Sequence, residues 1–126
     1  MGTYLLTGGN LADGAATQIY IADGVIVEVA PKILHPGAAI ATEIKVDGCI
    51  LLHGFVDLHT HLREPGREDS ETIASGSRAA AKGGFTAVSA MANTFPVADT
   101  AGVVEQVYRL GQATGLCDVF PIGAVT

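Results

Sequence analysis

The sequence predicts an α/β protein in which a small all-β domain precedes a unit of alternating strands and helices. Two observations support this prediction. Over residues 3–52, apolar side chains occur in short, β-branched or alternating runs, which is typical of strands. From Gly54 onward, short apolar runs alternate with stretches of helical spacing, as in βα units. The boundary falls at His53-Gly54, so the predicted domains are residues 1–53 and 54–126.

The first domain is predicted to contain several short strands, and we interpret it as β-sandwich-type. The strands are expected at residues 3–7, 18–22, 25–29, 43–46 and 49–52. Asp23-Gly24 predicts a two-residue hairpin, and Asp47-Gly48 predicts another turn. Residues 31–41, which include Pro36-Gly37, are expected to form a loop. Strands this short make little core, so we expect the domain to pack against something larger.

The second unit is predicted to contain three parallel strands and two helices. The strands are expected at residues 55–59, 85–91 and 117–125, the first of them buried on both faces. A helix is expected from about residue 70 to 82, capped by Asp69 or Ser70, with an inner stripe of Ile73, Ser77, Ala80 and Ala81. A second helix is expected between a cap at Asp99 or Thr100 and a stop at Gly115. Right-handed crossovers would join the strands.

Composition excludes several classes of protein. The chain has 126 residues, 48% of them hydrophobic, with a net charge of −6 and no Lys/Arg cluster. We therefore expect neither a nucleic-acid nor a membrane partner, since both favour a basic face. The N-terminus lacks the pattern of a signal peptide, and we expect a cytoplasmic protein. Cys49 and Cys117 are interpreted as reduced, buried thiols rather than as a disulfide or metal ligands.

His59 and His61 are candidate metal ligands. They lie two residues apart where an apolar run ends, so an extended strand would place both imidazoles on one face, with Asp57 on the same face. The carboxyl ends of parallel strands are where active sites form. Two neutral imidazoles there can share a zinc-like ion, and Asp57 can orient one of them. The alternative is local hydrogen bonding, which we favour for His35 and His53, the other two histidines.

Arg63 and Asn93 are candidate substrate-binding residues. Arg63 follows the histidines with the same parity and offers a planar fork for a carboxylate. The alternative is a surface arginine paired with Glu64 or Glu68. Asn93 holds the matching place after the second strand, and the alternative for it is a turn-forming role.

Three stretches carry a family resemblance. "GFVDLHTHLREPG", "ETIASGSRAAAKGGFTAV" and "MANT" with "PVAD" resemble the bacterial type I dihydroorotases of the amidohydrolase superfamily. The residues before them resemble that superfamily's N-terminal flanking domain. The sequence departs from the family in two places: His53-Gly54 stands where "PG" is frequent, and Ala92 stands where Pro is frequent. Neither change removes a group expected to contact metal or substrate.

The resemblance implies a zinc-dependent (β/α)8 barrel that interconverts N-carbamoyl-L-aspartate and L-dihydroorotate in pyrimidine biosynthesis. His59 and His61 would bind one or two zinc ions, and Arg63 and Asn93 would hold the substrate. A homo-oligomer is expected, with aspartate carbamoyltransferase as a candidate partner. A barrel takes about 250 residues. We therefore expect an incomplete barrel, an isolated chain without activity, and further ligands and the catalytic acid/base beyond Thr126.

Two other readings remain open. One is a related cyclic-amide hydrolase, such as an allantoinase or a dihydropyrimidinase, although these usually lack an arginine at the place of Arg63. The other is a catalytically silent homologue that serves as a scaffold. Loss of the histidines would be expected in a silent homologue, and both are present.

Overall fold

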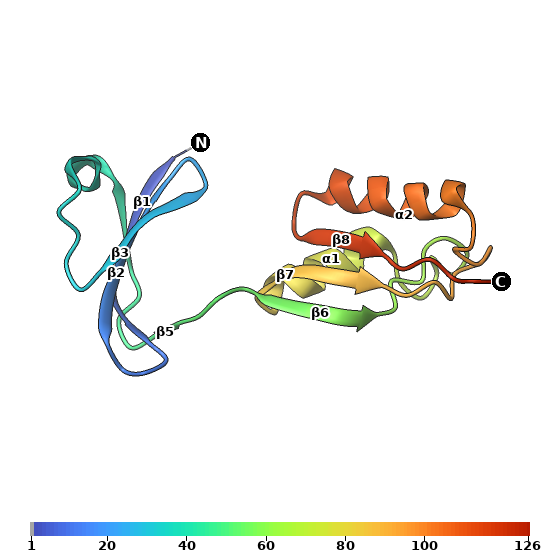
Figure 1. Cartoon of the computed structure of the whole chain (residues 1–126), viewed down its shortest axis with the longest axis horizontal. Helices are drawn as coiled ribbons and strands as arrows, with labels where there is room; N and C mark the ends of the chain where they lie inside the picture. The colour runs from blue at the N-terminus through green and yellow to red at the C-terminus, as the bar shows by residue number, and fades with distance from the viewer. Residues whose placement is uncertain (1) are drawn as a thin grey trace. The chain divides into compact units, whose positions relative to one another are not determined.

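The computed structural model describes residues 2–126. The chain divides into two compact units between His53 and Gly54. Each unit contains one sheet (Figure 1). No helix within residues 2–126 is both long enough and apolar enough to cross a membrane.

The first unit is a five-stranded mixed sheet. Its strands are β1 (Thr3–Leu11), β2 (Ala16–Ala22), β3 (Val25–Ala30), β4 (Thr42–Lys45) and β5 (Ile50–Leu51). The order is β3-β2-β1-β4, and β5 also pairs with β1. The β1–β2 and β2–β3 pairs are antiparallel, whereas β4 and β5 lie parallel to β1.

The turn chemistry of this unit is as the sequence predicts, but its strand arrangement is not. Asp23 and Gly24 both have positive φ and join β2 to β3 as a hairpin. β1 continues through Gly8, whose φ is +85°, because the register shifts between Leu6 and Gly9 as at a bulge. The sandwich-type prediction is not confirmed, since residues 2–53 form one sheet rather than two facing sheets.

The segment expected to be a loop contains a short 3₁₀ helix, Pro36–Ile40. His35 caps it, because its Nδ1 accepts a hydrogen bond from the Gly37 amide at 3.0 Å. The His35 ring also stacks on Tyr20, with the ring centroids 4.7 Å apart. This histidine therefore has a local structural role.

The second unit is a parallel sheet with helices between its strands. Its elements are β6 (Phe55–Thr60), α1 (Ile73–Lys82), β7 (Phe85–Ala90), α2 (Ala101–Thr114) and β8 (Asp118–Pro121). β7 lies between β6 and β8, and both pairs are parallel (Figure 1). α1 packs against β7 and α2, and α2 packs against β8.

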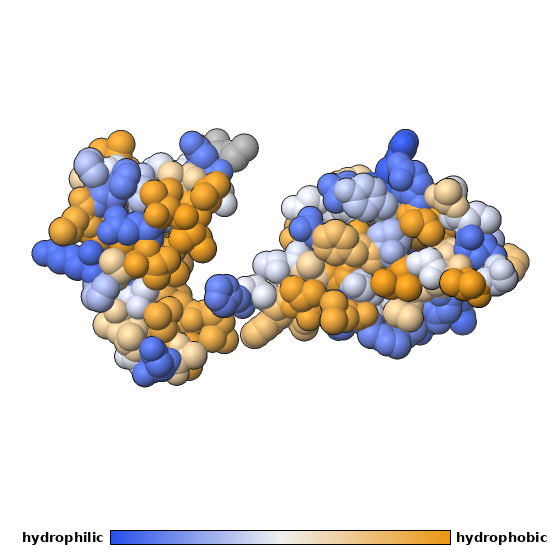
Figure 2. Space-filling model, viewed as in Figure 1, coloured by the Kyte–Doolittle hydropathy of each residue, from blue (hydrophilic) through white to orange (hydrophobic). Residues whose placement is uncertain are grey.

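The core of the second unit lies between the helices and the two strands that they cover. Ile73 and Val119 are fully buried, and Val88 and Val107 nearly so. β6 lies at the edge and is mostly exposed: Leu58 has 75% of its surface accessible. The expectation that residues 55–59 are buried on both faces is wrong for this chain, because the helices pack on the neighbouring strands. Apolar side chains are exposed on both units (Figure 2).

The first helix begins later than the sequence indicates, the second begins after Thr100 as predicted, and one thiol is misassigned. α1 is capped by Thr72, not by Asp69 or Ser70, and its side chain exchanges hydrogen bonds with Ser75 in a capping box. Thr100 occupies the N-cap position of α2 but makes no side-chain cap. Cys49 is exposed rather than buried, while Cys117 is half-buried.

Candidate active site at the carboxyl ends of the strands

The carboxyl ends of β6 and β7 are tied together. Thr60 pairs with Ala90. The Thr60 carbonyl accepts a hydrogen bond from the Met91 amide at 2.9 Å. The Thr60 hydroxyl donates to the Ser89 carbonyl at 2.8 Å. These bonds hold the segments that leave the two strands side by side, as expected for a parallel pair.

His59 and His61 lie next to each other at this edge. Their ring centroids are 5.1 Å apart, and the ring planes are inclined by 64°. The shared face that their parity predicts is therefore confirmed, whereas their metal role remains a prediction. Asp57 does not contact either ring through a hydrogen bond; its Oδ1 accepts from the His59 amide at 3.0 Å. Asp57 thus fixes the backbone beneath the pair rather than an imidazole.

Asn93 reaches the same place from the segment after β7. Its Oδ1 lies 2.9 Å from Nδ1 of His61. The structure therefore brings three of the four predicted site residues together. Sequence spacing places Asn93 near this edge, but it gives no signal of a direct contact with a histidine 32 positions away.

Arg63 is half-buried and has a left-handed backbone, with φ +62°. The strand ends at Thr60, so the parity argument that linked Arg63 to the histidines does not apply to it. Pairing of Arg63 with a nearby carboxylate is also not observed. Among residues 2–126, the structure contains a single ion pair, between Arg109 and Glu105.

The two glutamates near Arg63 have other partners. Glu64 Oε2 accepts from the Ile73 amide at 2.8 Å, at the start of α1. Glu68 Oε1 accepts from the Gly66 amide at 2.8 Å. This bond, together with a bond from the amide of Glu68 itself, holds the pKa of the Glu68 carboxyl below its usual value. Both carboxylates thus bind backbone amides of the loop and of the helix start, and neither forms an ion pair with Arg63.

The loops that follow β6 and β7 contact each other. The Phe95 amide donates to the Pro65 carbonyl at 3.0 Å. Gly66 lies directly against Phe95, where a Cβ atom would clash with the Phe95 backbone, and its φ of +102° also favours glycine. The peptide bonds Glu64–Pro65 and Phe95–Pro96 are both cis. The contacts of Pro65 and Gly66 with Phe95 join the two loops.

A cavity of about 520 Å³ opens beside His61 and Asn93. Its other lining residues follow β7 and β8 and are Met91, Ala92, Val97, Ile122, Gly123 and Ala124. The lining is mostly apolar, with the imidazole and the amide as its polar groups. Such a lining suits a small ligand held by a few polar contacts.

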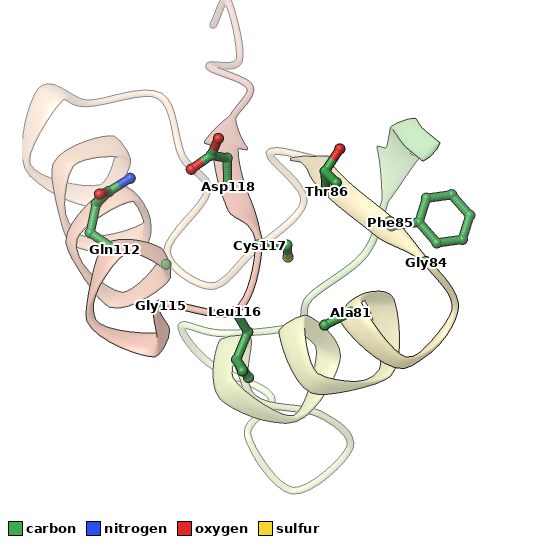
Figure 3. Close-up of a pocket in the computed structure, with 10 residues that line it drawn as sticks. Ala81, Gly84, Phe85, Thr86, Gln112, Gly115, Leu116, Cys117 and Asp118 are labelled. Atoms are coloured by element: carbon green, nitrogen blue, oxygen red, sulfur yellow. The ribbon is translucent and has the colours of Figure 1, made fainter. Parts of the chain in front are cut away.

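A second cavity, of about 480 Å³, lies at the opposite end of the sheet. It is formed where β7 and β8 begin and where α1 and α2 end, and Phe85, Thr86, Cys117 and Asp118 line part of it (Figure 3). Its lining contains no imidazole. The candidate ligands for a metal are therefore at the other end.

The side chains at the carboxyl ends of β6 and β7 fit part of a metal site. Two adjacent imidazoles suit a zinc-like divalent ion. Within residues 2–126, no cluster of three or more His, Cys, Asp or Glu side chains is placed to hold an ion. His59 and His61 can thus supply two ligands of a larger set.

The fold matches that of the corresponding part of solved hydantoinase and dihydropyrimidinase chains. L-hydantoinase from Arthrobacter aurescens matches with a TM-score of 0.78 and 22% identity, over 98% of this chain and 28% of that one. Dihydropyrimidinase from Brevibacillus agri matches with a TM-score of 0.71 and 22% identity, over 98% of this chain and 27% of that one. At this identity, the likeness shows the fold alone.

The particular family is defined by sequence. The family model described as dihydro-orotase-like matches residues 48–126, so the chain belongs to this family. It is 59% identical over 127 residues to a dihydroorotase from Streptomyces coelicolor, covering 100% of this chain and 29% of that protein. It is 53% identical over 114 residues to a dihydroorotase from Mycobacterium tuberculosis, covering 90% of this chain and 26% of that protein. The chain spans less than a third of the length of these relatives.

Proposed function

We propose that this chain forms the N-terminal part of a dihydroorotase, which interconverts N-carbamoyl-L-aspartate and L-dihydroorotate. The observation that carries the proposal is the meeting of His59, His61 and Asn93 at the carboxyl ends of two parallel strands. Membership of the dihydro-orotase-like family supports the choice of reaction. We also propose that residues 54–126 contribute to a (β/α)8 barrel, with residues 1–53 as a flanking domain.

The two histidines are proposed to bind zinc. Their adjacent rings and the chemistry of imidazole support this assignment. Bound zinc would polarise the scissile amide and lower the pKa of a water molecule. The contribution of this chain is to hold the two rings together, since Asp57 fixes the His59 backbone and Asn93 contacts His61.

Arg63 and Asn93 are proposed to bind the substrate. A guanidinium can grip a carboxylate with two parallel hydrogen bonds, and Arg63 is not taken up by Glu64 or Glu68. Asn93 borders the cavity and can donate its amide hydrogens to a ligand there. We assign no catalytic acid or base within residues 2–126. A homo-oligomer, and an assembly with aspartate carbamoyltransferase, are further proposals from the family.

The test is a hybrid enzyme. Residues 1–126 would replace the matching N-terminal region of the Streptomyces coelicolor dihydroorotase. The match includes the whole of this chain, at 59% identity. The hybrid, loaded with zinc, should hydrolyse dihydroorotate. His59→Ala and His61→Ala should each lower kcat/KM by at least about a hundredfold, because each removes a metal ligand.

Two controls make the outcome specific. His53→Ala removes an exposed histidine of the first unit and should leave kcat/KM unchanged. The isolated 126-residue chain with zinc should be inactive, because two imidazoles do not complete a catalytic zinc site. A folded, zinc-loaded hybrid without turnover, or turnover that survives both histidine substitutions, contradicts the proposal. Hydrolysis of dihydrouracil or hydantoin in preference to dihydroorotate would assign the related hydrolase function instead.

A further inference from the structure

We propose that Asn93 is a positioning residue that fixes the tautomer of His61. In this role its side-chain oxygen holds the proton of the imidazole on Nδ1 and leaves Nε2 as the nitrogen with a free lone pair. The inference deepens the proposed metal role of His61 and rests on it, but the tautomer itself can be measured without metal or substrate.

The first argument is the geometry of the contact. Nδ1 of His61 and Oδ1 of Asn93 are 2.9 Å apart, a usual length for an N–H···O hydrogen bond. An amide oxygen only accepts, so the proton between the two atoms must belong to the ring nitrogen. A neutral imidazole carries one N–H, and Nε2 is then unprotonated.

The second argument is that Asn93 is held in place independently of His61. On one side of it, the Met91 amide donates to the Thr60 carbonyl at 2.9 Å. On the other side, the Thr94 hydroxyl donates to the Pro96 carbonyl at 2.7 Å, and the Phe95 amide donates to Pro65 at 3.0 Å. A short segment anchored at both ends presents the amide at a fixed place, so it can select one orientation of the histidine ring.

The third argument is that the oxygen and the nitrogen of the Asn93 amide have different roles. Asn93 Oδ1 is occupied by His61, whereas the NH₂ group has no partner within residues 2–126. Asn93 also borders the cavity. The same side chain can therefore orient a ring with its oxygen and donate to a ligand with its nitrogen, and an aspartate would keep only the first ability.

The experiment measures the ring nitrogens of His61 directly. Long-range ¹⁵N–¹H correlation spectra of the metal-free 126-residue chain, recorded where imidazoles are neutral, distinguish a protonated Nδ1 from a protonated Nε2. His61 should show a protonated Nδ1 and a free Nε2. The exposed His53 should show the mixture typical of a ring in water. A protonated Nε2 in His61 overturns the inference.

Variants test whether Asn93 is the cause. Asn93→Ala should move the His61 signals to those of His53, whereas Asn93→Asp keeps an acceptor and should preserve the protonated Nδ1. Asn10→Ala, at the other asparagine of the chain, should change nothing. An unchanged His61 tautomer in Asn93→Ala overturns the inference.

Zinc retention by the hybrid enzyme supplies an independent measurement. Asn93→Ala should weaken zinc binding about 10- to 100-fold, as loss of a group that orients a ligand does, and Asn93→Asp should restore most of it. Equal zinc affinity of the Ala and Asp variants contradicts the inference. Failure of the proposed function looks different: the tautomer result then holds while His61→Ala leaves zinc binding and turnover unchanged.

Discussion

The backbone at Arg63 determines what a substitution there can report. Its φ of +62° is left-handed, and arginine and lysine are about equally unfavourable in that conformation because neither is β-branched. Arg63→Lys therefore changes the guanidinium fork with little change in backbone strain. Loss of activity in this variant can be assigned to the side chain.

We expect Arg63→Lys in the hybrid enzyme to raise KM for dihydroorotate about tenfold or more. An ammonium keeps the charge but cannot make two parallel bonds to a carboxylate, and charge-assisted hydrogen bonds contribute about 1.5–3 kcal/mol. Steady-state kinetics measures this effect. Arg67→Lys, at an exposed arginine four residues later, is the matched control and should leave KM unchanged. If both variants have the KM of the parent, Arg63 is a surface residue.

Glu68 gives a pH-dependent prediction. Amide donors from Gly66 and from Glu68 itself stabilise its ionised form, so the folded-state pKa is below the unfolded one. The contribution of Glu68 to the free energy of unfolding is therefore present above its unfolded-state pKa and is lost as the pH falls through its folded-state pKa. Carboxyl ¹³C titration should place the Glu68 pKa below the usual glutamate range. A pKa within or above that range would show that the Gly66 amide does not donate to this carboxylate.

The site residues differ in how far the sequence could predict them. The placement of both histidines on one face follows from their spacing on a strand, and the structure has them adjacent. The same reasoning does not reach Arg63, because the chain leaves the extended conformation after Thr60. The contact between Asn93 and His61 depends on two loops that meet in space, and no local pattern encodes it.

At the scale of the elements, α1 shows why helix starts are hard to locate. Asp69 and Ser70 are good capping residues by type, but Thr72 is the cap. Glu64 also satisfies an amide of the first turn, from nine residues upstream. A carboxylate brought in by a folded loop cannot be recognised from local sequence, whereas the end of the helix at Gly83-Gly84 can.

Two glycines of α2 form a matched pair for a stability test. Gly111 faces β8, where an added Cβ would lie 2.5 Å from Val119 Cβ, while a Cβ at Gly102 would meet nothing within 4 Å. Gly111→Ala should lower the free energy of unfolding by about 1–2 kcal/mol, because overpacking outweighs the helix propensity gained. Gly102→Ala should raise it by up to about 1 kcal/mol.

Urea unfolding followed by circular dichroism at the helical band measures both variants, since α1 and α2 both lie in the second unit. The parent chain is the reference. A Gly111→Ala variant as stable as Gly102→Ala would mean that α2 lies farther from β8 than the structure has it.

At the scale of the whole molecule, the alternation of strands and helices predicts the parallel sheet of the second unit well. Chain order and spatial order coincide there, because each short crossover places the next strand beside the last. The first unit is less predictable. Its hairpin at Asp23-Gly24 is encoded locally, but the parallel pairing of β4 and β5 with β1 joins segments more than 35 residues apart. The single sheet of that unit follows from those distant pairings.

The sheet order also makes a prediction about amide exchange in the second unit. β7 has a neighbour on both sides, whereas β6 has one neighbour within residues 2–126. A parallel strand with one neighbour leaves every second amide outside the ladder. Hydrogen–deuterium exchange followed by NMR should therefore find the slowest amides in β7 and faster ones in β6. Equal protection of the two strands would contradict this order.

The hydrogen bonds of the two imidazoles differ. The His59 amide bonds to the Asp57 side chain, but the His59 ring has no hydrogen-bond partner within residues 2–126. The His61 ring is held through Asn93 to the segment that follows the central strand. The His61 ring is therefore held in one orientation, whereas the His59 ring can reorient. In the proposed metal site, His59 alone would then adjust to an incoming ion, while the His61 ring keeps its orientation.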